Sequence, residues 1–201
     1  VFNKLKVLNL SGCGQLRSTE GLSTFPEMKL LILEGCSKLK EIHPDIEKLS
    51  RLALLNMKDC RNLVKLPDSI CYLPVLRELL LAGCSKLRCL PDSFGLNILE
   101  TINLSNCSCL EKLPDSICKV PSVRKLLLAG CSKLRCLPDA LGCLKNLEIL
   151  IADHCQALEE LPHSIGGLRS LQALHLKGTA FTELPDSICA LTDLRELDLS
   201  E

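Results

Sequence analysis

The sequence predicts an α/β solenoid, in which short parallel strands stack along one axis and short helical segments cover the outside. Cysteine recurs with gaps of 23 or 24 residues along most of the chain. The words around it return with the same period, as in LKVLNLSGC, LRELLLAGC and VRKLLLAGC. Self-similarity at a fixed period of about 20–50 residues is the signature of a stacked repeat architecture. Each repeat buries its apolar face against its neighbours, so we expect one continuous array.

The repeating unit reads L-x-x-L-x-L-x-x-C-x-x-L-x-x-L-P-x-x-I-x-x-L-x-x, which is a leucine-rich repeat. The L-x-L pair has the period of a strand with one buried face. Residues 1–201 therefore form a single array of eight repeats plus a ninth strand, which we expect to be a fragment without terminal caps. The repeats begin at Leu5, Met28, Leu52, Leu76, Leu99, Val123, Leu147, Leu171 and Leu194.

The outer side of each repeat begins at the L-P step. Proline fixes φ near −65° and lacks an amide proton, and the D-S that follows caps turns and helix starts. Only a 3₁₀ helix or a short helical segment fits before the next strand, so the convex layer is thin and the arc shallow. Three repeats depart from the rule. The first has T-E-G-L-S-T-F-P and an irregular convex side, the fourth is shortened so that Leu96 slides inward, and the eighth places Thr179 at the cysteine position.

Composition and charge exclude several classes of function. Lys and Arg together number 24, Asp and Glu together number 24, and the formal net charge is zero. Nucleic-acid binders usually show a basic excess or stripe, and none is visible. No apolar run approaches the length needed to span a bilayer. Aromatic residues make up only 2% of the chain, which disfavours stacking platforms for bases or flat cofactors. We expect no nucleic acid, membrane or small-molecule partner, and we expect end-to-end association of an uncapped array.

Seven cysteines form a ladder at an inward-facing position where the chain leaves each strand. Disulfides would join the cysteines in pairs, whereas this ladder repeats in the same way in every turn, so we expect free thiols. The cytosol keeps such thiols reduced, so we expect a cytoplasmic protein. Each thiol should be satisfied by backbone of its own turn. The cysteines outside the ladder, such as Cys71, Cys89, Cys118, Cys136 and Cys189, should fill gaps in the convex layer. The ladder consists of Cys13, Cys36, Cys60, Cys84, Cys107, Cys131 and Cys155.

Two motifs together resemble one family. The words L-x-G-C-S-K-L and L-P-D-S-I-C-x-L, beside the variant G-T-A-F-T-E-L-P, are similar to the repeat region of plant intracellular nucleotide-binding leucine-rich-repeat disease-resistance receptors of the TIR type. The resemblance runs from Leu5 to Ser200. It implies a sensor that recognises a pathogen-derived or host protein and restrains a nucleotide-binding switch. No phosphate loop G-x-x-x-x-G-K-[ST] occurs here, so no nucleotide site is carried over.

No catalytic, metal or cofactor site is expected. Structural zinc needs two close ligand pairs, and the closest cysteines, Cys107 and Cys109, have no partner pair at the right spacing. The repeated D-S words are better explained as turn and cap devices than as nucleophiles, because a nucleophile needs a base within reach. We therefore expect a binding protein and not an enzyme.

The concave sheet face is the candidate binding surface. Aliphatic residues recur on it where polar residues are expected, and contiguous exposed apolar surface usually marks a protein contact. Lys125 and Asp153 would fix a partner's register at the rim. The central column of the predicted site consists of Ile32, Asn56, Leu80, Asn103, Leu127, Ile151 and His175. The function we expect is protein recognition in a plant immune receptor. A freestanding intracellular leucine-rich scaffold, or the substrate-selecting arm of a ubiquitin ligase, is the alternative.

Overall fold

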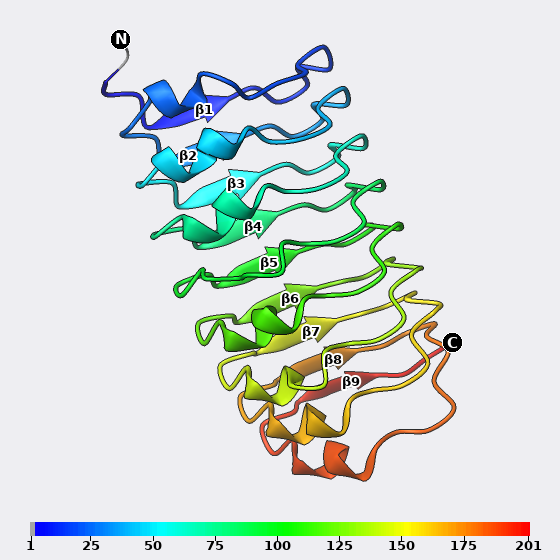
Figure 1. Ribbon diagram of the computed structural model, residues 1–201. Helices are drawn as coiled ribbons and strands as arrows, with labels where there is room; N and C mark the ends of the chain where they lie inside the picture. The colour runs from blue at the N-terminus through cyan, green and yellow to red at the C-terminus, as the bar shows by residue number, and fades with distance from the viewer. Residues whose placement is uncertain (1–2) are drawn as a thin grey trace.

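The computed structural model describes residues 3–201 and shows a solenoid with one coil per repeat (Figure 1). Nine three-residue strands form one parallel sheet, in which every strand pairs with the strand of the next coil. The predicted solenoid and its parallel sheet are confirmed. The strands are β1 (Val7–Asn9), β2 (Leu30–Ile32), β3 (Leu54–Asn56), β4 (Glu78–Leu80), β5 (Thr101–Asn103), β6 (Lys125–Leu127), β7 (Ile149–Ile151), β8 (Ala173–His175) and β9 (Glu196–Asp198).

The period-two pattern explains which strand residues are buried. The middle residue of β2 to β8 points into the coil and is fully buried, as Leu31, Leu79 and Leu126 show. The residues on either side of it face outward and are half-buried or exposed. Because equivalent positions pair across every pair of neighbouring strands, the buried residues form one continuous apolar row along the axis.

Three residues after each of β1 to β8 the backbone takes a left-handed conformation. Gly83 and Gly130 occupy this position before Cys84 and Cys131, with φ of 76° and 74°. Asn106 takes the same conformation before Cys107, with φ of 60°. Asn tolerates this region better than most residues with a Cβ atom. The sharp bend limits the strands to three residues and turns the next side chain inward.

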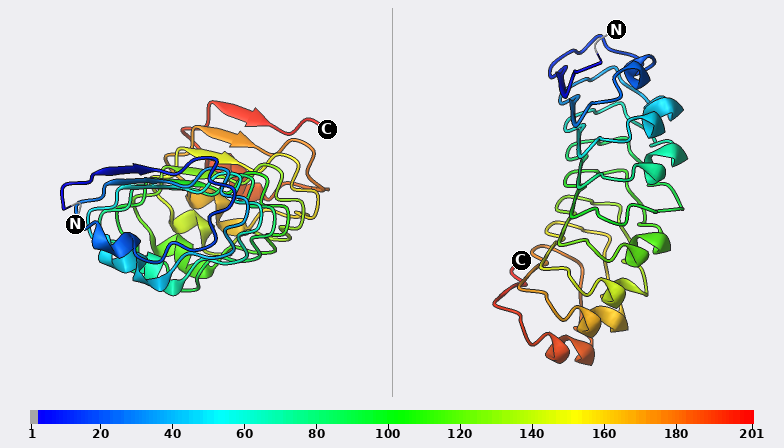
Figure 2. Two further views of the ribbon diagram at one scale, coloured as in Figure 1. Left: turned by 90° about the horizontal axis from the view of Figure 1, so that it is seen from above. Right: turned by 90° about the vertical axis from the view of Figure 1, so that its left-hand side faces the viewer.

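Short 3₁₀ helices form the convex layer, as the L-P step predicts. Pro67, Pro114, Pro162 and Pro185 each precede one in extended conformation. The helices are η1 (Leu22–Thr24), η2 (Pro44–Lys48), η3 (Asp68–Tyr72), η4 (Asp115–Lys119), η5 (Leu141–Cys143), η6 (His163–Gly167) and η7 (Asp186–Ala190). Figure 2 shows the strands along the inner side of a shallow arc and these helices along its outer side.

The irregular repeats behave differently from one another. In the fourth repeat no helix lies between β4 and β5, and Leu96 is 1% exposed beside the buried Phe94, so the expected inward shift is confirmed. The first repeat is irregular on its convex side, as expected, with a short helix that has no buried residue. The left-handed Gly21, with φ of 84°, redirects the chain and lets the three-residue helix η1 form without an L-P step.

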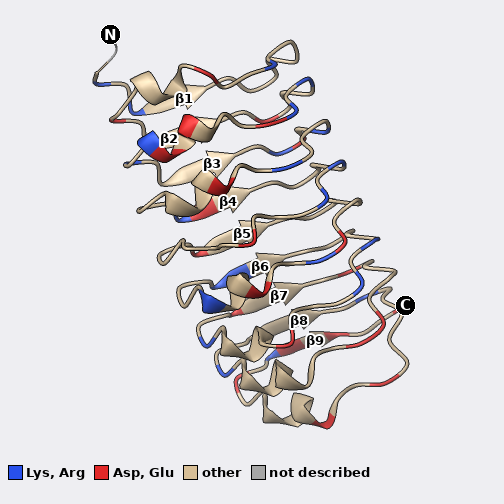
Figure 3. Ribbon diagram, in the orientation of Figure 1, with Lys and Arg blue, Asp and Glu red and all other residues tan. Residues whose placement is uncertain are grey.

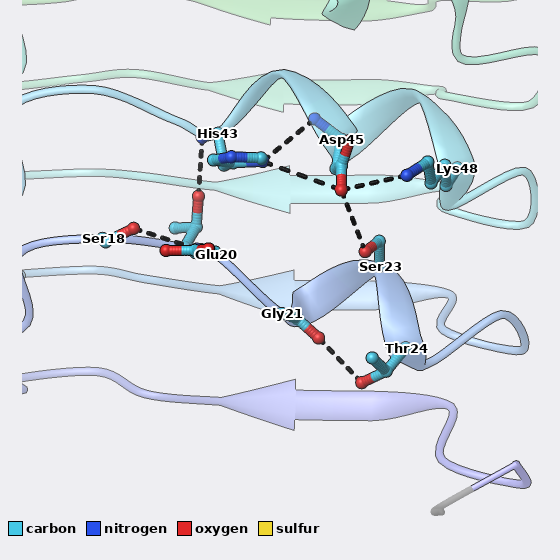
Figure 4. Close-up of polar contacts among 9 residues, drawn as sticks. Ser18, Glu20, Gly21, Ser23, Thr24, His43, Asp45 and Lys48 are labelled. Atoms are coloured by element: carbon cyan, nitrogen blue, oxygen red, sulfur yellow. Dashed lines mark hydrogen bonds and ion pairs between the residues drawn. The ribbon is translucent and has the colours of Figure 1, made fainter.

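Polar contacts tie the first two coils together on the convex side (Figure 4). The backbone amide of His43 donates to the hydroxyl of the buried Thr19 at 2.8 Å. The Asp45 carboxylate lies 3.0 Å from the Lys48 ammonium and accepts from the Ser23 hydroxyl at 3.5 Å. The hydrogen bond with Lys48 lowers the pKa of Asp45. These contacts replace part of the apolar packing that the first convex segment lacks.

Candidate functional site

The sheet register brings the predicted central column together on the concave face. Asn56 pairs with Leu80, Leu80 with Asn103, Asn103 with Leu127 and Leu127 with Ile151. Ile32 and His175 extend this row at its two ends. All seven side chains are half-buried by their neighbours in the same row. The column is therefore a continuous surface, whose binding role stays a prediction.

One aliphatic cluster of the face lies on β6 and β7. Leu127 lies directly beside Ile151, and Ile149 stands two residues before Ile151 on the same face. Lys125, which is exposed, pairs with Ile149 at one side of this cluster. Asp153 lies beyond Ile151 at the other side. The two predicted rim charges thus flank the aliphatic cluster on opposite sides.

The carboxylate of Asp153 at the rim already accepts a hydrogen bond within the protein. The Asp153 side chain accepts a hydrogen bond from the backbone amide of Lys177 at 2.9 Å. One carboxylate oxygen therefore helps to hold the next coil in place. The other lone pairs of the carboxylate stay available to a donor on a partner.

The asparagines of the column accept hydrogen bonds from the backbone in addition to facing the surface. The side-chain oxygen of Asn103 accepts from the amide of Ser105 at 3.0 Å, and that of Asn56 accepts from the amide of Lys58 at 3.0 Å. These are side-chain turns that satisfy the backbone where the strand ends. The amide nitrogen of Asn56 also donates to Glu34 at 3.2 Å. The side-chain amide nitrogen of Asn103 and the second hydrogen of that of Asn56 are left to donate to a partner.

His175 contacts a residue that the sequence reasoning missed. Its Nε2 atom lies 3.2 Å from the Glu196 carboxylate on β9, an ion pair when the imidazole is protonated. Ion pairs were also missed where the chain approaches each strand, namely Arg51 with Glu27, Arg77 with Glu100, and Arg124 with Glu148. The sequence carries their signal, because opposite charges recur 23 or 24 residues apart.

The structure buries six of the seven ladder cysteines, and Cys13 is exposed. Each buried thiol donates to a backbone carbonyl of the preceding coil. The expectation that the thiol is satisfied in its own coil is therefore wrong. The six acceptors are Leu10 for Cys36, Leu33 for Cys60, Met57 for Cys84, Leu81 for Cys107, Leu104 for Cys131 and Leu128 for Cys155, at 3.1–3.3 Å.

The backbone hydrogen bonds of the bend explain why each thiol donates to the preceding coil and not to its own. The amide of Cys107 donates to the Leu104 carbonyl of its own coil, which also accepts the Cys131 thiol of the next coil. A carbonyl oxygen has two lone pairs, so one acceptor serves two coils. The cysteine side chain points across to the neighbouring carbonyl. Cys13 lies in the first coil that the structure describes, and its side chain is exposed.

Burial keeps the thiols of Cys36, Cys60, Cys84 and Cys107 protonated, whereas the contact with Cys131 lowers the pKa of Cys155. Burial raises the pKa of Cys60 and of Cys107 to about 12, against an ordinary value of 9.0. It also raises the pKa of Cys36 and of Cys84. For Cys131, the contact with the Cys155 thiol and burial both raise the pKa. Because the thiolate is the nucleophile and the metal ligand, these side chains act as small apolar groups near neutral pH.

The seven cysteines outside the ladder differ in exposure, with Cys109 half-buried and Cys143 exposed. Cys71 and Cys118 are buried and fill the convex layer as expected. Burial raises the pKa of each of these thiols to about 11.

Cys89, Cys136 and Cys189 are exposed, so the gap-filling interpretation is wrong for them. The L-P step turns Cys89 and Cys136 outward. Cys189 holds the position of the buried Cys71 and Cys118, but no later helix among residues 3–201 packs on η7.

Residues 3–201 contain neither a cluster of metal-binding side chains nor a membrane-spanning helix. No group of three or more His, Cys, Asp and Glu side chains in this part of the chain is arranged to hold a metal ion. None of the helices within the same residues is long and apolar enough to cross a membrane.

Known proteins resemble this chain in sequence and in fold. The family model described as Leucine Rich Repeat matches residues 99–120. The chain is 38% identical over 92 residues to the disease resistance protein RPS4B of Arabidopsis thaliana, a match that covers 45% of this chain and 8% of that protein. It is 29% identical over 176 residues to the disease resistance-like protein DSC1 of the same plant, covering 86% and 14%.

The solved structures extend the likeness in fold to almost the whole chain. The leucine-rich repeat domain of the type III effector XopL superposes with a TM-score of 0.73 at 24% identity, covering 98% of this chain and 69% of that domain. A TDR receptor gives a TM-score of 0.64 at 20% identity, covering 98% and 39%. The chain spans only 8% and 14% of the length of the two curated relatives named above. It is a leucine-rich repeat solenoid whose sequence relatives are disease resistance proteins of plants.

Proposed function

We propose that this chain is the protein-recognition module of an intracellular plant immune receptor and that it binds a pathogen-derived or host protein through its concave face. Sequence similarity to plant disease resistance proteins supports the biological setting. Restraint of a nucleotide-binding switch, encoded outside these residues, belongs to the same proposal. A structural neighbour, the receptor kinase HAESA, was solved in complex with the peptide hormone IDA and the co-receptor SERK1.

The observation that carries the proposal is the aliphatic cluster on β6 and β7. Leu127, Ile151 and Ile149 stand on the sheet face at half-buried positions, where a surface strand usually carries polar residues. Leu80 lies two strands away from Leu127 in the same row. Covering a Leu or Ile side chain completely is worth about 1.5–3 kcal/mol, so these half-exposed side chains offer a partner several favourable contacts.

The size of the cluster suits one segment of a partner protein. Neighbouring strands stand about 4.8 Å apart, so the row from Leu80 to Ile151 spans roughly 14 Å. Lys125 on one side and the free lone pairs of Asp153 on the other supply charges of opposite sign. Asn103 interrupts the aliphatic row and directs its amide nitrogen to the surface. A partner with an apolar ridge and a central acceptor would match this arrangement.

The proposal is tested by replacing Leu127 with Asp, with Lys119→Asp on η4 as the control of matched charge on the convex side. Tagged proteins are expressed in plant tissue, and the proteins recovered with each are quantified by mass spectrometry. We expect partners of the unmodified chain to be lost from Leu127→Asp and retained by Lys119→Asp. Equal recovery with both variants, or loss of the circular dichroism spectrum in Leu127→Asp, would mean that the concave face is not the binding surface.

Two further expectations belong to this proposal. The chain acts by binding and has no catalytic role of its own, consistent with the leucine-rich repeat fold. End-to-end association stays a prediction, and light scattering over a range of protein concentrations would detect it as a rise in mean mass.

A further inference from the structure

A basic groove runs along the loops that leave the strands of the first four coils. Its volume is about 540 Å³, and it is lined by Arg17, Lys38, Lys40, Asn62 and Lys86. Figure 3 shows Lys and Arg in these loops at the right-hand edge of the view. The linear sequence shows no basic run, and the stripe arises only because the coil stacks residues 23 or 24 apart.

The cations of the groove have no negative partner. No ion pair within residues 3–201 includes Arg17, Lys38, Lys40 or Lys86. No acidic residue lines the groove. All four cationic side chains are exposed and reach solvent from the same edge. Their like charges repel one another, so a bound anion would relieve this repulsion.

Neutral amides hold two of these ammonium groups in place. Lys38 donates to the side-chain oxygen of Gln15 at 2.7 Å, and Lys86 donates to that of Asn62 at 2.7 Å. The Asn62 side chain is itself anchored, because it donates to the Ser37 carbonyl at 2.6 Å. The amides orient the lysines without neutralising them. Each ammonium keeps further donor capacity for a ligand.

Other edges of the solenoid arrange their charges differently. Where the chain approaches β5, the Arg77 guanidinium pairs with Glu100 of the next coil, and Arg124 pairs with Glu148 in the same way. The column that contains Arg17 and Lys40 continues to Glu111 and Arg135, whose backbones are hydrogen-bonded to each other. Charges of opposite sign alternate there. In the first four coils this column contains no acidic residue.

We propose that this groove binds an acidic, extended segment of a partner protein. The site is separate from the concave face and does not depend on the function proposed for it. An acidic peptide fits better than a nucleic acid, because the chain has a formal net charge of zero and only 2% aromatic residues for stacking on bases. Carboxylates are the complementary groups that peptide chemistry supplies to Lys and Arg.

The spacing of the cations sets the length of the segment. Arg17 lies in the first coil and Lys86 in the fourth, so they are separated by three coil spacings, or about 14 Å at about 4.8 Å each. An extended chain rises about 3.3 Å per residue, so about five residues cover the groove. Alternate side chains of such a segment point the same way. Acidic residues at every second position would face the four cations.

The test uses fluorescence anisotropy with a short labelled peptide of alternating Glu and Ser. We expect the 201-residue chain to bind this peptide and to lose affinity as NaCl is raised. The double variant Lys38→Gln and Lys40→Gln should bind about tenfold more weakly, because each exposed ion pair contributes a few-fold. The charge-preserving variant Lys38→Arg and Lys40→Arg should retain most of the affinity.

Arg135→Gln is the matched control, since it removes one cation from the equivalent column outside the groove. It should change affinity less than twofold, on the scale of a single exposed, screened charge. The proposal is wrong if the chain does not bind the peptide, or if the double Gln variant and Arg135→Gln lose affinity equally. It is also wrong if a Gln-Ser peptide binds as well as the Glu-Ser peptide, or if single-stranded oligo(dT) binds as tightly. Circular dichroism confirms that each variant is folded.

Discussion

The interior coils and the two ends of the array use the ladder position differently. In the coil of Cys107 the thiol crosses to the preceding coil and donates to Leu81 at 3.3 Å. In the eighth coil the hydroxyl of Thr179 stays in its own coil and donates to Leu176 at 2.7 Å. Cys13, in the first coil, is exposed. The ladder is therefore a contact between coils, which exists only where an inward thiol has a neighbour on the N-terminal side.

This difference matters because the stability of a solenoid is approximately a sum over repeats and the interfaces between neighbours. The Cys107 thiol donates to Leu81 of the preceding coil, and its amide shares the Leu104 carbonyl with the Cys131 thiol of the next coil, so Cys107 lies between two interfaces. The exposed Cys13 contributes little to any interface. Substitutions at equivalent positions of the sequence should therefore differ in effect according to their place along the axis.

The largest difference should appear when a charge is introduced. Cys107→Asp would place a carboxylate in an apolar site without a partner, at a cost of roughly 3–5 kcal/mol. Cys13→Asp should change the free energy of unfolding by less than about 0.5 kcal/mol, because this side chain is exposed. Urea denaturation followed by circular dichroism measures both. Similar losses from the two variants would show that the first coil is packed like the interior.

Alkaline pH should weaken the interior coils. The folded protein holds the thiols of Cys60 and Cys107 at a raised pKa of about 12, whereas an unfolded chain releases these protons near the ordinary value of 9.0. Between these values the folded state binds more protons than the unfolded state, so the free energy of unfolding falls as pH rises. Below pH 9 this contribution is constant. Urea midpoints at several pH values from 7 to about 11 would record the decline.

The Cys107→Ala variant isolates the contribution of one thiol. It should show a shallower decline above pH 9, because one group with a raised pKa has been removed. Cys13→Ala should follow the unmodified protein at every pH, since this side chain is exposed and lies outside the packed interior. A decline of the same slope in all three proteins would assign the pH dependence to groups other than the ladder.

Exchanging the two side chains sharpens the comparison. Cys107→Thr adds a methyl branch to a fully buried position and shortens the reach of the donor towards Leu81. Overpacking of a filled interior costs about 1–3 kcal/mol, and we expect a loss in this range in the urea experiment. A cost below the error of that measurement would show that a hydroxyl can serve the interior coil as well as a thiol.

The reverse exchange should have the smallest effect. Thr179→Cys replaces a half-buried hydroxyl that is satisfied within its own coil. We expect a change of less than about 1 kcal/mol, since one neutral hydrogen bond has about this net value. Thermal unfolding followed by circular dichroism is sensitive enough. A large loss here would show that the Leu176 carbonyl depends on this hydroxyl.

The charged residues can be read from the sequence, but which of them form pairs is decided by the structure. Each member of the pair Arg77 and Glu100 is visible in the sequence, and so is each cation of the basic groove. Whether two such charges meet depends on the direction of long side chains at neighbouring coils, which the period alone does not determine. The same limit applies to Asn103, whose turn with the Ser105 amide is recognisable only when the strand end is known.

By itself the sequence determined the architecture: the number and order of the strands, the buried L-x-L rows, the 3₁₀ segments after the L-P steps and the inward shift of Leu96. These features follow from local periodicity, because a residue's position in the repeat decides whether it faces the core. It also placed Leu80, Leu127 and Ile151 in one row, since equivalent positions pair in a parallel array.

Only the tertiary structure decided which coil satisfies each thiol, that Cys89 and Cys136 face solvent while Cys71 is buried, and that four cations share one groove. These outcomes are relations between residues 23 to 27 positions apart. They depend on the stacking distance, on side-chain direction and on which carbonyl still has a free lone pair. The repeat pattern defines one coil, whereas contacts between coils are set by how they stack.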